Sequence, residues 1–302
     1  MKPRFSNWQL FAVCVLVWGT TWHAITHQID TVAAEVAVAF RFTLAGLAAL
    51  AIARWRGESL IHCSAAHAWF ALQGVFMYGV AYVAVYHAEI HVPSGLVAVA
   101  YSASPLLAGL GAQVVFGVPV TRRFVAGGLL GLLGVVLIFW PELGAASDRP
   151  NAGRGLAFTI AAVFLSAVGS VAASRNRVRG LPLWPALGFG MLYGAATAAV
   201  VAVALGRSFA LPATTPWWTA LLYLALAGSV LAFACFLELQ HRIGPGPASA
   251  IGVMTPIIAL AVSIGLEGYR PDGRAGAGAA LAVLGNFWML RRPPRPSASA
   301  AG

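Results

Sequence analysis

The sequence predicts an all-α polytopic membrane protein with ten transmembrane helices in two inverted five-helix repeats. Of its 302 residues, 60% are hydrophobic and only 9% are charged, with a mean hydropathy of +0.80. Soluble domains have roughly 25% charged residues. Apolar stretches of the length needed to cross about 30 Å of hydrocarbon recur along the whole chain. Part of the second half also repeats the first, and no room is left for a soluble domain.

Ten segments have the length and composition of membrane spans, and proline and other turn-forming residues separate most of them. The expected spans are 8–26, 33–54, 68–88, 94–116, 123–140, 154–174, 184–205, 217–239, 246–267 and 274–290. Lys2 and Arg4 before the first span resemble the start of a secretory signal, but no small-residue cleavage site follows. We therefore expect an uncleaved span. The terminal segment 293–302 is rich in Pro, Ser and Ala and predicts a disordered cytoplasmic tail.

The positive residues are distributed unevenly between alternate loops. If both termini are cytoplasmic, the inner segments hold 13 of the 19 Lys and Arg residues, the outer segments hold five, and Arg41 lies within a span. The positive-inside rule then predicts a multi-pass protein of a bacterial cytoplasmic membrane with both termini inside. Because the +10 net charge is scattered between apolar runs, we expect no nucleic-acid partner.

The two halves of the chain are related in sequence. Residues 95–135 align without a gap on residues 246–286, and ten of the 41 positions are identical, where this composition alone would give about four. Five spans are an odd number, so the second copy is inverted relative to the first. We expect repeats at 1–143 and 144–292. Inverted repeats favour transport, because such a chain can adopt two related packings around a central site.

Several short motifs occur in the order and spacing of a known family. They are Trp18-Gly19-Thr20-Thr21-Trp22, Phe40-Arg41-Phe42, Ser104-Pro105, Thr255-Pro256 and the Gly-rich fifth and tenth spans. Over nearly its whole length the chain resembles the EamA family of the drug/metabolite transporter superfamily. The resemblance implies a secondary exporter of amino acids or related small metabolites that works by alternating access. It also implies that spans one, three, four, six, eight and nine line the cavity.

Two prolines and one arginine lie inside expected spans. Pro105 and Pro256 each free a helix carbonyl, so they mark either broken helices at a cavity or simple packing kinks. Arg41 lies about 12 Å into its span, where a charge costs about 2.5 to 3.5 kcal/mol. It either binds an anionic group of the substrate or is structural, bonded to helix carbonyls or to Glu267. The structural role is favoured, because the resemblance attaches to the Arg-Phe pair whatever the substrate.

Aromatic and hydroxyl side chains supply the other candidate binding residues. Tyr78, Tyr82 and Tyr86 recur every fourth residue and form one stripe on the third span. With Trp18, Trp22 and Tyr101 the stripe predicts a cavity for an amphipathic or aromatic solute. The alternative is ordinary packing, with Tyr86 and Trp22 in an interfacial belt. The candidate polar partners are Thr20, Thr21, Ser102, Ser166, Ser170 and Thr255.

Histidines, acids and glycines complete the candidates. His23 and His27, and His87 and His91, have a spacing that permits metal binding, but we expect no metal site and no cofactor. His87 and Glu267 are the candidates for proton coupling, and Glu238 takes the place of His87 in the repeat register. Glycines on the fifth and tenth spans predict close packing between the halves, with a homodimer as the alternative. These glycines are Gly127, Gly131, Gly134, Gly276 and Gly278.

Three classes of function compete: a secondary transporter, an intramembrane enzyme, and a channel or scaffold subunit. An exporter of aromatic or drug-like compounds is the closest alternative to an amino acid exporter. An intramembrane enzyme is disfavoured because the sequence has no G-x-S-x-G, H-E-x-x-H or Walker motif. A channel would need a filter motif, and a scaffold subunit would not need a repeat. We therefore expect a non-enzymatic protein whose partners are a small-molecule substrate and the lipid bilayer.

Overall fold

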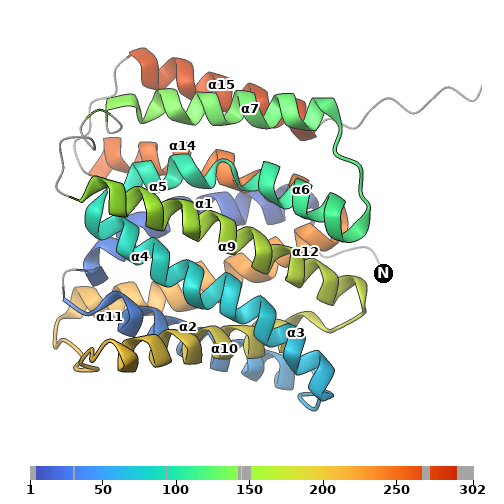
Figure 1. Cartoon of the computed structure of the whole chain (residues 1–302), viewed down its shortest axis with the longest axis vertical. Helices are drawn as coiled ribbons and strands as arrows, with labels where there is room; N and C mark the ends of the chain where they lie inside the picture. Colours follow the sequence, from blue (N-terminus) through green and yellow to red (C-terminus); the bar gives the residue numbers. More distant parts are fainter. Residues whose placement is uncertain are drawn as a thin grey trace, which may run out of the picture.

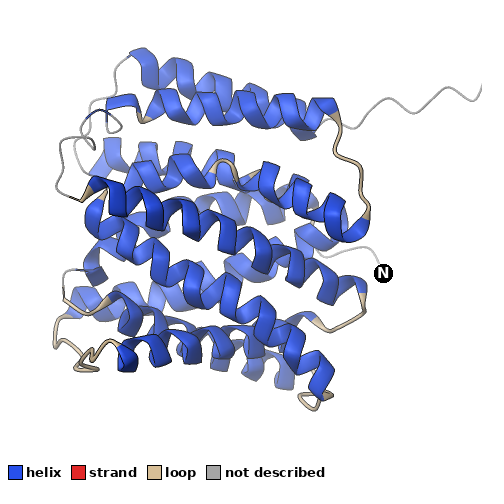
Figure 2. Ribbon diagram, viewed as in Figure 1, coloured by secondary structure: helices blue, strands red, loops and turns tan. Residues whose placement is uncertain are grey.

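The computed structural model describes residues 5–29, 31–92, 94–141, 144, 151–266 and 273–290. These residues form helices and connecting loops without any strand (Figure 2). Eight helical segments among them are long and apolar enough to cross a membrane. The all-α class expected from the sequence is confirmed.

The helices follow the predicted spans, but several spans are divided. The first part of the chain contains α1 Asn7–Ile29, α2 Ala34–Trp55, α3 Ser64–Gly74, the π-helix η1 Val75–Val80, α4 Ala81–His91, α5 Ser94–Tyr101, α6 Ser104–Phe116 and α7 Arg122–Ile138. The second part contains α9 Ala152–Val178, α10 Leu183–Ala204, α11 Thr215–Tyr223, the π-helix η2 Leu224–Leu231, α12 Ala232–Ile243, α13 Pro245–Ala248, α14 Ile251–Leu266 and α15 Gly273–Leu290.

The long helices lie side by side and reverse direction from one to the next (Figure 1). The pair α7 and α15 forms one edge of the bundle, α2 and α10 form the opposite edge, and α1, α4, α9, α12 and α14 lie between them. We call the end of the bundle at which α1 begins the N face, and the opposite end the far face. α15 ends at the N face, where α1 begins.

The glycines of α7 and α15 allow the backbones of these two helices to pack in direct contact. A Cβ atom on Gly134 would lie 2.4 Å from the backbone nitrogen of Ala282, and one on Gly127 would lie 2.7 Å from the carbonyl oxygen of Gly285. The two helices belong to different halves of the chain, so the expected packing between the halves is present. Gly276 does not take part, because nothing lies within 4 Å of a Cβ placed there.

The fourth and ninth spans are each divided near a proline, but the two prolines lie differently with respect to the break. α5 ends at Tyr101 and α6 begins at Ser104, so Pro105 lies in the first turn after a break. Pro256 lies inside α14, and the break of that span precedes it at 249–250. Of the two alternatives, a broken helix thus fits Pro105, whereas Pro256 lies within a continuous helix. A helix can keep a proline when a neighbouring hydroxyl satisfies the freed carbonyl.

The hydroxyl groups before the two prolines act in the same way. Ser104 Oγ donates to the carbonyl oxygen of Tyr101 over 2.5 Å, and Thr255 Oγ1 donates to that of Gly252 over 3.5 Å. These are the carbonyls four residues before each proline, which lose their usual helical partner. The two arrangements are 151 residues apart, the offset found in the sequence.

The π-helices η1 and η2 occur in the third and eighth spans, and the offset of 151 places Val75 on Leu226 within η2. A π-helix shifts the hydrogen bonds by one residue and leaves backbone groups for other partners. In η2 the hydroxyl of Ser229 donates to the carbonyl oxygen of Leu224 over 2.8 Å. The sequence analysis did not predict either segment.

Candidate functional site

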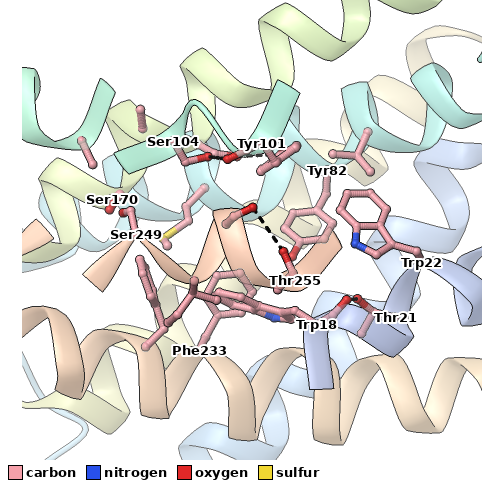
Figure 3. A pocket seen from close by; sticks show the side chains of 18 of the residues that line it. Trp18, Thr21, Trp22, Tyr82, Tyr101, Ser104, Ser170, Phe233, Ser249 and Thr255 are labelled. Atoms are coloured by element: carbon pink, nitrogen blue, oxygen red, sulfur yellow. Dashed lines mark hydrogen bonds between the residues drawn. The ribbon is translucent and has the colours of Figure 1, made fainter. Parts of the chain in front are cut away.

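A cavity of about 130 Å³ lies in the middle of the bundle, between residues from both halves of the chain. A water molecule needs about 10 to 15 Å³ measured in this way, so the cavity has room for a small solute. Figure 3 shows side chains of α1, such as Trp18 and Trp22, facing the same space as Tyr82 and Tyr101. The wall is mostly aromatic and apolar, as in small-molecule sites of other proteins.

Nine of the 14 candidate binding residues lie in this wall. They are Trp18, Thr21, Trp22, Arg41, Tyr82, Tyr101, Ser166, Ser170 and Thr255. They come from six helices, so the fold brings together residues up to 237 positions apart, from Trp18 to Thr255. Their contact with a substrate remains a prediction.

The other five candidates lie outside the cavity wall; they are Thr20, Tyr78, Ser102, Pro105 and Pro256. Thr20 is hydrogen-bonded to the hydroxyl of Tyr223. The hydroxyl of Tyr78 accepts from Gln73 Nε2 over 3.2 Å in the core. Ser102, directly after α5, donates to the carbonyl oxygen of Val99 in that helix. Each of these three polar side chains therefore has a structural partner.

Tyr82 is the residue of the predicted tyrosine stripe that reaches the cavity. Tyr86 is fully buried, and its hydroxyl donates to Gln28 Oε1 over 2.8 Å. The alternative that placed Tyr86 in an interfacial belt is therefore wrong. One face of a long helix packs against several different elements along its length. Residues on that face are therefore all buried, but they do not all reach the same site.

Arg41 is 1% exposed and lies in the cavity wall. Its Nε donates to Ser229 Oγ of η2 over 3.0 Å, and its guanidinium lies over the ring of Tyr82, 4.7 Å from the ring centre. Its Nη1 is buried and has no hydrogen-bond partner. Glu267, the carboxylate partner considered above, lies outside the described residues. The Ser229 hydroxyl and the Tyr82 ring thus contact the guanidinium group, and its Nη1 is left without a hydrogen-bond partner.

Trp18 is fixed from behind by the eighth span. Its Nε1 donates over 3.0 Å to the carbonyl oxygen of Gly228 in η2. Its ring lies 5.0 Å from the ring of Phe233 and 5.4 Å from that of Phe236, which both line the cavity. The sequence analysis missed both phenylalanines, although the family resemblance implied that span eight lines the cavity.

Two hydrogen bonds fix the hydroxyl groups of α9. The hydroxyls of Tyr101 and Ser166 lie 3.0 Å apart, and Gln240 Nε2 donates to Ser170 Oγ over 2.6 Å. Gln240 is buried on α12 and was not among the candidates. These bonds connect α5, α9 and α12 around the cavity.

His87 lies at the far face, outside the cavity wall. Its Nε2 is 2.6 Å from Glu35 Oε1 of α2, and Arg207 Nε is 3.7 Å from the other oxygen of Glu35. The carboxylate is almost completely buried. The far-face cluster, which we define as Glu35, His87 and Arg207, therefore joins the two halves of the chain. Glu35 and Arg207 had not been predicted to interact.

Glu238 forms a corresponding cluster at the N face. Its carboxylate lies 3.2 Å from Arg177 Nη2 of α9 and 2.8 Å from Arg242 Nε. We call Arg177, Glu238 and Arg242 the N-face cluster. Glu238 follows His87 by the repeat offset of 151 residues. His87 and Glu238, which this offset relates, thus lie in polar clusters at opposite ends of the bundle.

The model of the EamA-like transporter family matches this chain twice, over residues 7–140 and 153–291. The chain belongs to this family. The resemblance inferred from the sequence is confirmed, and this EamA-like transporter is a membrane transport protein. The cavity lies between the two matched segments, since Trp18, Arg41 and Tyr101 come from the first and Ser166 and Thr255 from the second.

Relatives of this EamA-like transporter share its length. The uncharacterized inner membrane transporter YedA of Escherichia coli strain K12 is 26% identical over 276 residues, covering 89% of this chain and 84% of YedA. Protein PecM of Dickeya dadantii is 24% identical over 96% of this chain and 95% of its own. Among solved structures, one crystal structure of a protein superposes with a TM-score of 0.76 at 22% identity, covering 92% of this chain and 94% of that one.

Proposed function

We propose that this transporter is a secondary exporter of amino acids or related small metabolites, and not an enzyme. The observation that carries the proposal is the free Nη1 donor of Arg41 in the wall of an aromatic cavity. A guanidinium binds a carboxylate through two parallel hydrogen bonds, and aromatic rings suit an apolar side chain. An amphipathic solute with one carboxylate satisfies both parts of the wall.

An exporter of aromatic or drug-like compounds is the second candidate. The rings of Trp18, Trp22, Tyr82, Tyr101 and Phe233 all face the cavity. A flat aromatic solute could stack on them without using Arg41. The two candidates differ in whether binding requires the carboxylate of the solute.

For the whole chain we propose ten crossings in two inverted five-helix repeats, at 1–143 and 144–292, with both termini in the cytoplasm. The π-helices at matching positions and the matched proline motifs support the repeat. α7 and α15, packed together, would supply the fifth and tenth crossings, the two that are not among the eight candidate spans. YedA is named an inner membrane transporter, which supports the same membrane for this chain.

Alternating access would use the two ion-pair clusters as gates. Both clusters are present in the structure: Glu35 contacts His87 and Arg207 at the far face, and Glu238 contacts Arg177 and Arg242 at the N face. With both clusters formed, the proposed gates at the two faces are both closed, as in an occluded state. Opening one face would break one cluster and leave the other intact. His87 is the proposed proton-sensitive member, because a histidine holds a carboxylate most strongly when it is charged.

A binding screen on the purified protein tests the proposal. The unfolding temperature is measured with each of the twenty amino acids, with dipeptides and with cationic dyes, because a ligand of the folded state raises it. We expect a rise with at least one amino acid and transport of that compound into proteoliposomes. A rise with dyes alone would favour the second candidate, and no transport of any stabilising compound would refute the proposal.

A further inference from the structure

A carboxylate on α4 continues the helix face that lines the cavity. Glu89 lies one turn after Val85 and two turns after Tyr82, and both of these residues line the cavity. Residues at this spacing share one side of a helix. Glu89 therefore lies beyond the end of the cavity that points to the far face.

The carboxylate of Glu89 is buried and unpaired. Neither of its oxygens is accessible to solvent, and neither has a hydrogen-bond partner. Arg41 is the charged residue that interacts with it electrostatically, but within the described part of the chain no salt bridge joins the two. An ionised carboxylate in such a place is costly unless another group compensates its charge.

Two buried donors without partners lie in the adjoining cavity wall. They are Nη1 of Arg41 and Nε1 of Trp22. Buried polar groups in proteins are nearly always hydrogen-bonded, so three such groups near one end of a cavity indicate a polar ligand. The ligand must offer acceptors to Arg41 and Trp22, and donors to Glu89.

We infer that Glu89 binds the ammonium group of a zwitterionic substrate whose carboxylate is bound by Arg41. The inference rests on the proposed function and narrows it to solutes that carry both charges. A substrate with only a carboxylate would leave Glu89 uncompensated, and one with only an ammonium group would leave Arg41 uncompensated. One acid and one base in the protein thus match a ligand of zero net charge.

Ligand analogues test the inference on the unaltered protein. The amino acid that raises the unfolding temperature most is compared with its N-acetyl derivative, which lacks the ammonium group, and with its methyl ester, which lacks the carboxylate. We expect each derivative to have a Kd at least tenfold higher than that of the free amino acid. An N-acetyl derivative that binds as tightly as the amino acid would overturn the inference and leave the proposed export intact. If no amino acid binds, the proposed function itself fails.

A variant links this discrimination to Glu89. Glu89→Gln keeps the shape of the side chain but removes its charge, so the Kd of the free amino acid should rise at least tenfold while that of the N-acetyl derivative stays the same. Glu58→Gln, in the loop between α2 and α3, is the matched control and should behave like the unaltered protein. Unchanged discrimination in a folded Glu89→Gln protein would overturn the inference, even if the pH dependence of transport were lost. Should this variant fail to fold, the analogue series decides.

Discussion

At the scale of single residues, the polar side chains of the cavity are fixed by hydrogen bonds to residues outside its wall. Ser229 Oγ accepts from Arg41, the carbonyl oxygen of Gly228 accepts from Trp18, and Gln240 donates to Ser170. Each of these partners lies in η2 or α12, that is, in the eighth span. Changes in this span would therefore alter the site without touching a substrate.

Replacing Arg41 by lysine tests the role of the guanidinium. Lysine keeps the charge but loses the planar fork and the bond from Nε to Ser229. We expect transport into proteoliposomes to fall at least tenfold, which corresponds to about 1.4 kcal/mol of lost binding, with normal insertion into the membrane. Arg56→Lys, at an exposed position after α2, should have no effect. Equal kinetics for Arg41→Lys and the unaltered protein would assign Arg41 to the structure alone.

The sequence could predict many aromatic and hydroxyl members of the site, but not Phe233 or Phe236 and only part of the charged ones. Trp18, Trp22 and Tyr101 lie in motifs with a recognisable order, so they could be named in advance. Glu89 and Glu35 could not, because their importance depends on which groups surround them. Glu35 gains its partners from α4 and from the loop after α10, far away in the sequence.

At the scale of helices, α7 and α15 pack through glycines, so that their backbones are in direct contact. Without a hydrophobic driving force between helices in lipid, small residues that allow close approach provide the attraction. The sequence revealed these glycines, and their partners are as expected for packing between the halves. It could not reveal the π-helices, because Leu224–Leu231 has an ordinary helical composition and its hydrogen bonds are set by Arg41, Trp18 and other neighbours.

Gly134→Ala should destabilise this helix pair. The new Cβ atom would lie 2.4 Å from a backbone nitrogen of α15, so the helices must separate, and such overpacking typically costs about 1 to 3 kcal/mol. The unfolding temperature in detergent should fall by several degrees. Gly276→Ala adds the same atom where nothing lies within 4 Å and serves as the control. Equal unfolding temperatures for the two variants would refute the described packing.

The contact between α2 and α4 through His87 and Glu35 should matter for the proposed proton coupling. His87 Nε2 lies 2.6 Å from Glu35 Oε1, and His87→Gln removes a side chain that can take up and release a proton. We expect an imposed proton gradient to change the rate of transport by the unaltered protein and to have no effect on the variant. The same response to the gradient in both proteins would exclude His87 as the sensor.

At the scale of the whole molecule, a cavity lies between two related halves, and a cluster of charged and polar side chains lies at each face of the bundle. His87 of the far-face cluster and Glu238 of the N-face cluster are 151 residues apart, the offset of the repeat. A rocking motion of one half against the other would open one end at a time. The account therefore requires that a residue in the cavity can be reached from both sides of the membrane.

Labelling of a single cysteine in the cavity tests this requirement directly. Cys14, Cys63 and Cys235 are replaced, Thr255→Cys is introduced, and oriented vesicles are treated with a membrane-impermeant thiol reagent on one side or the other. We predict that the cysteine reacts from both sides and that a bound substrate slows both reactions. Reaction from one side only, whatever substrate is present, would contradict alternating access.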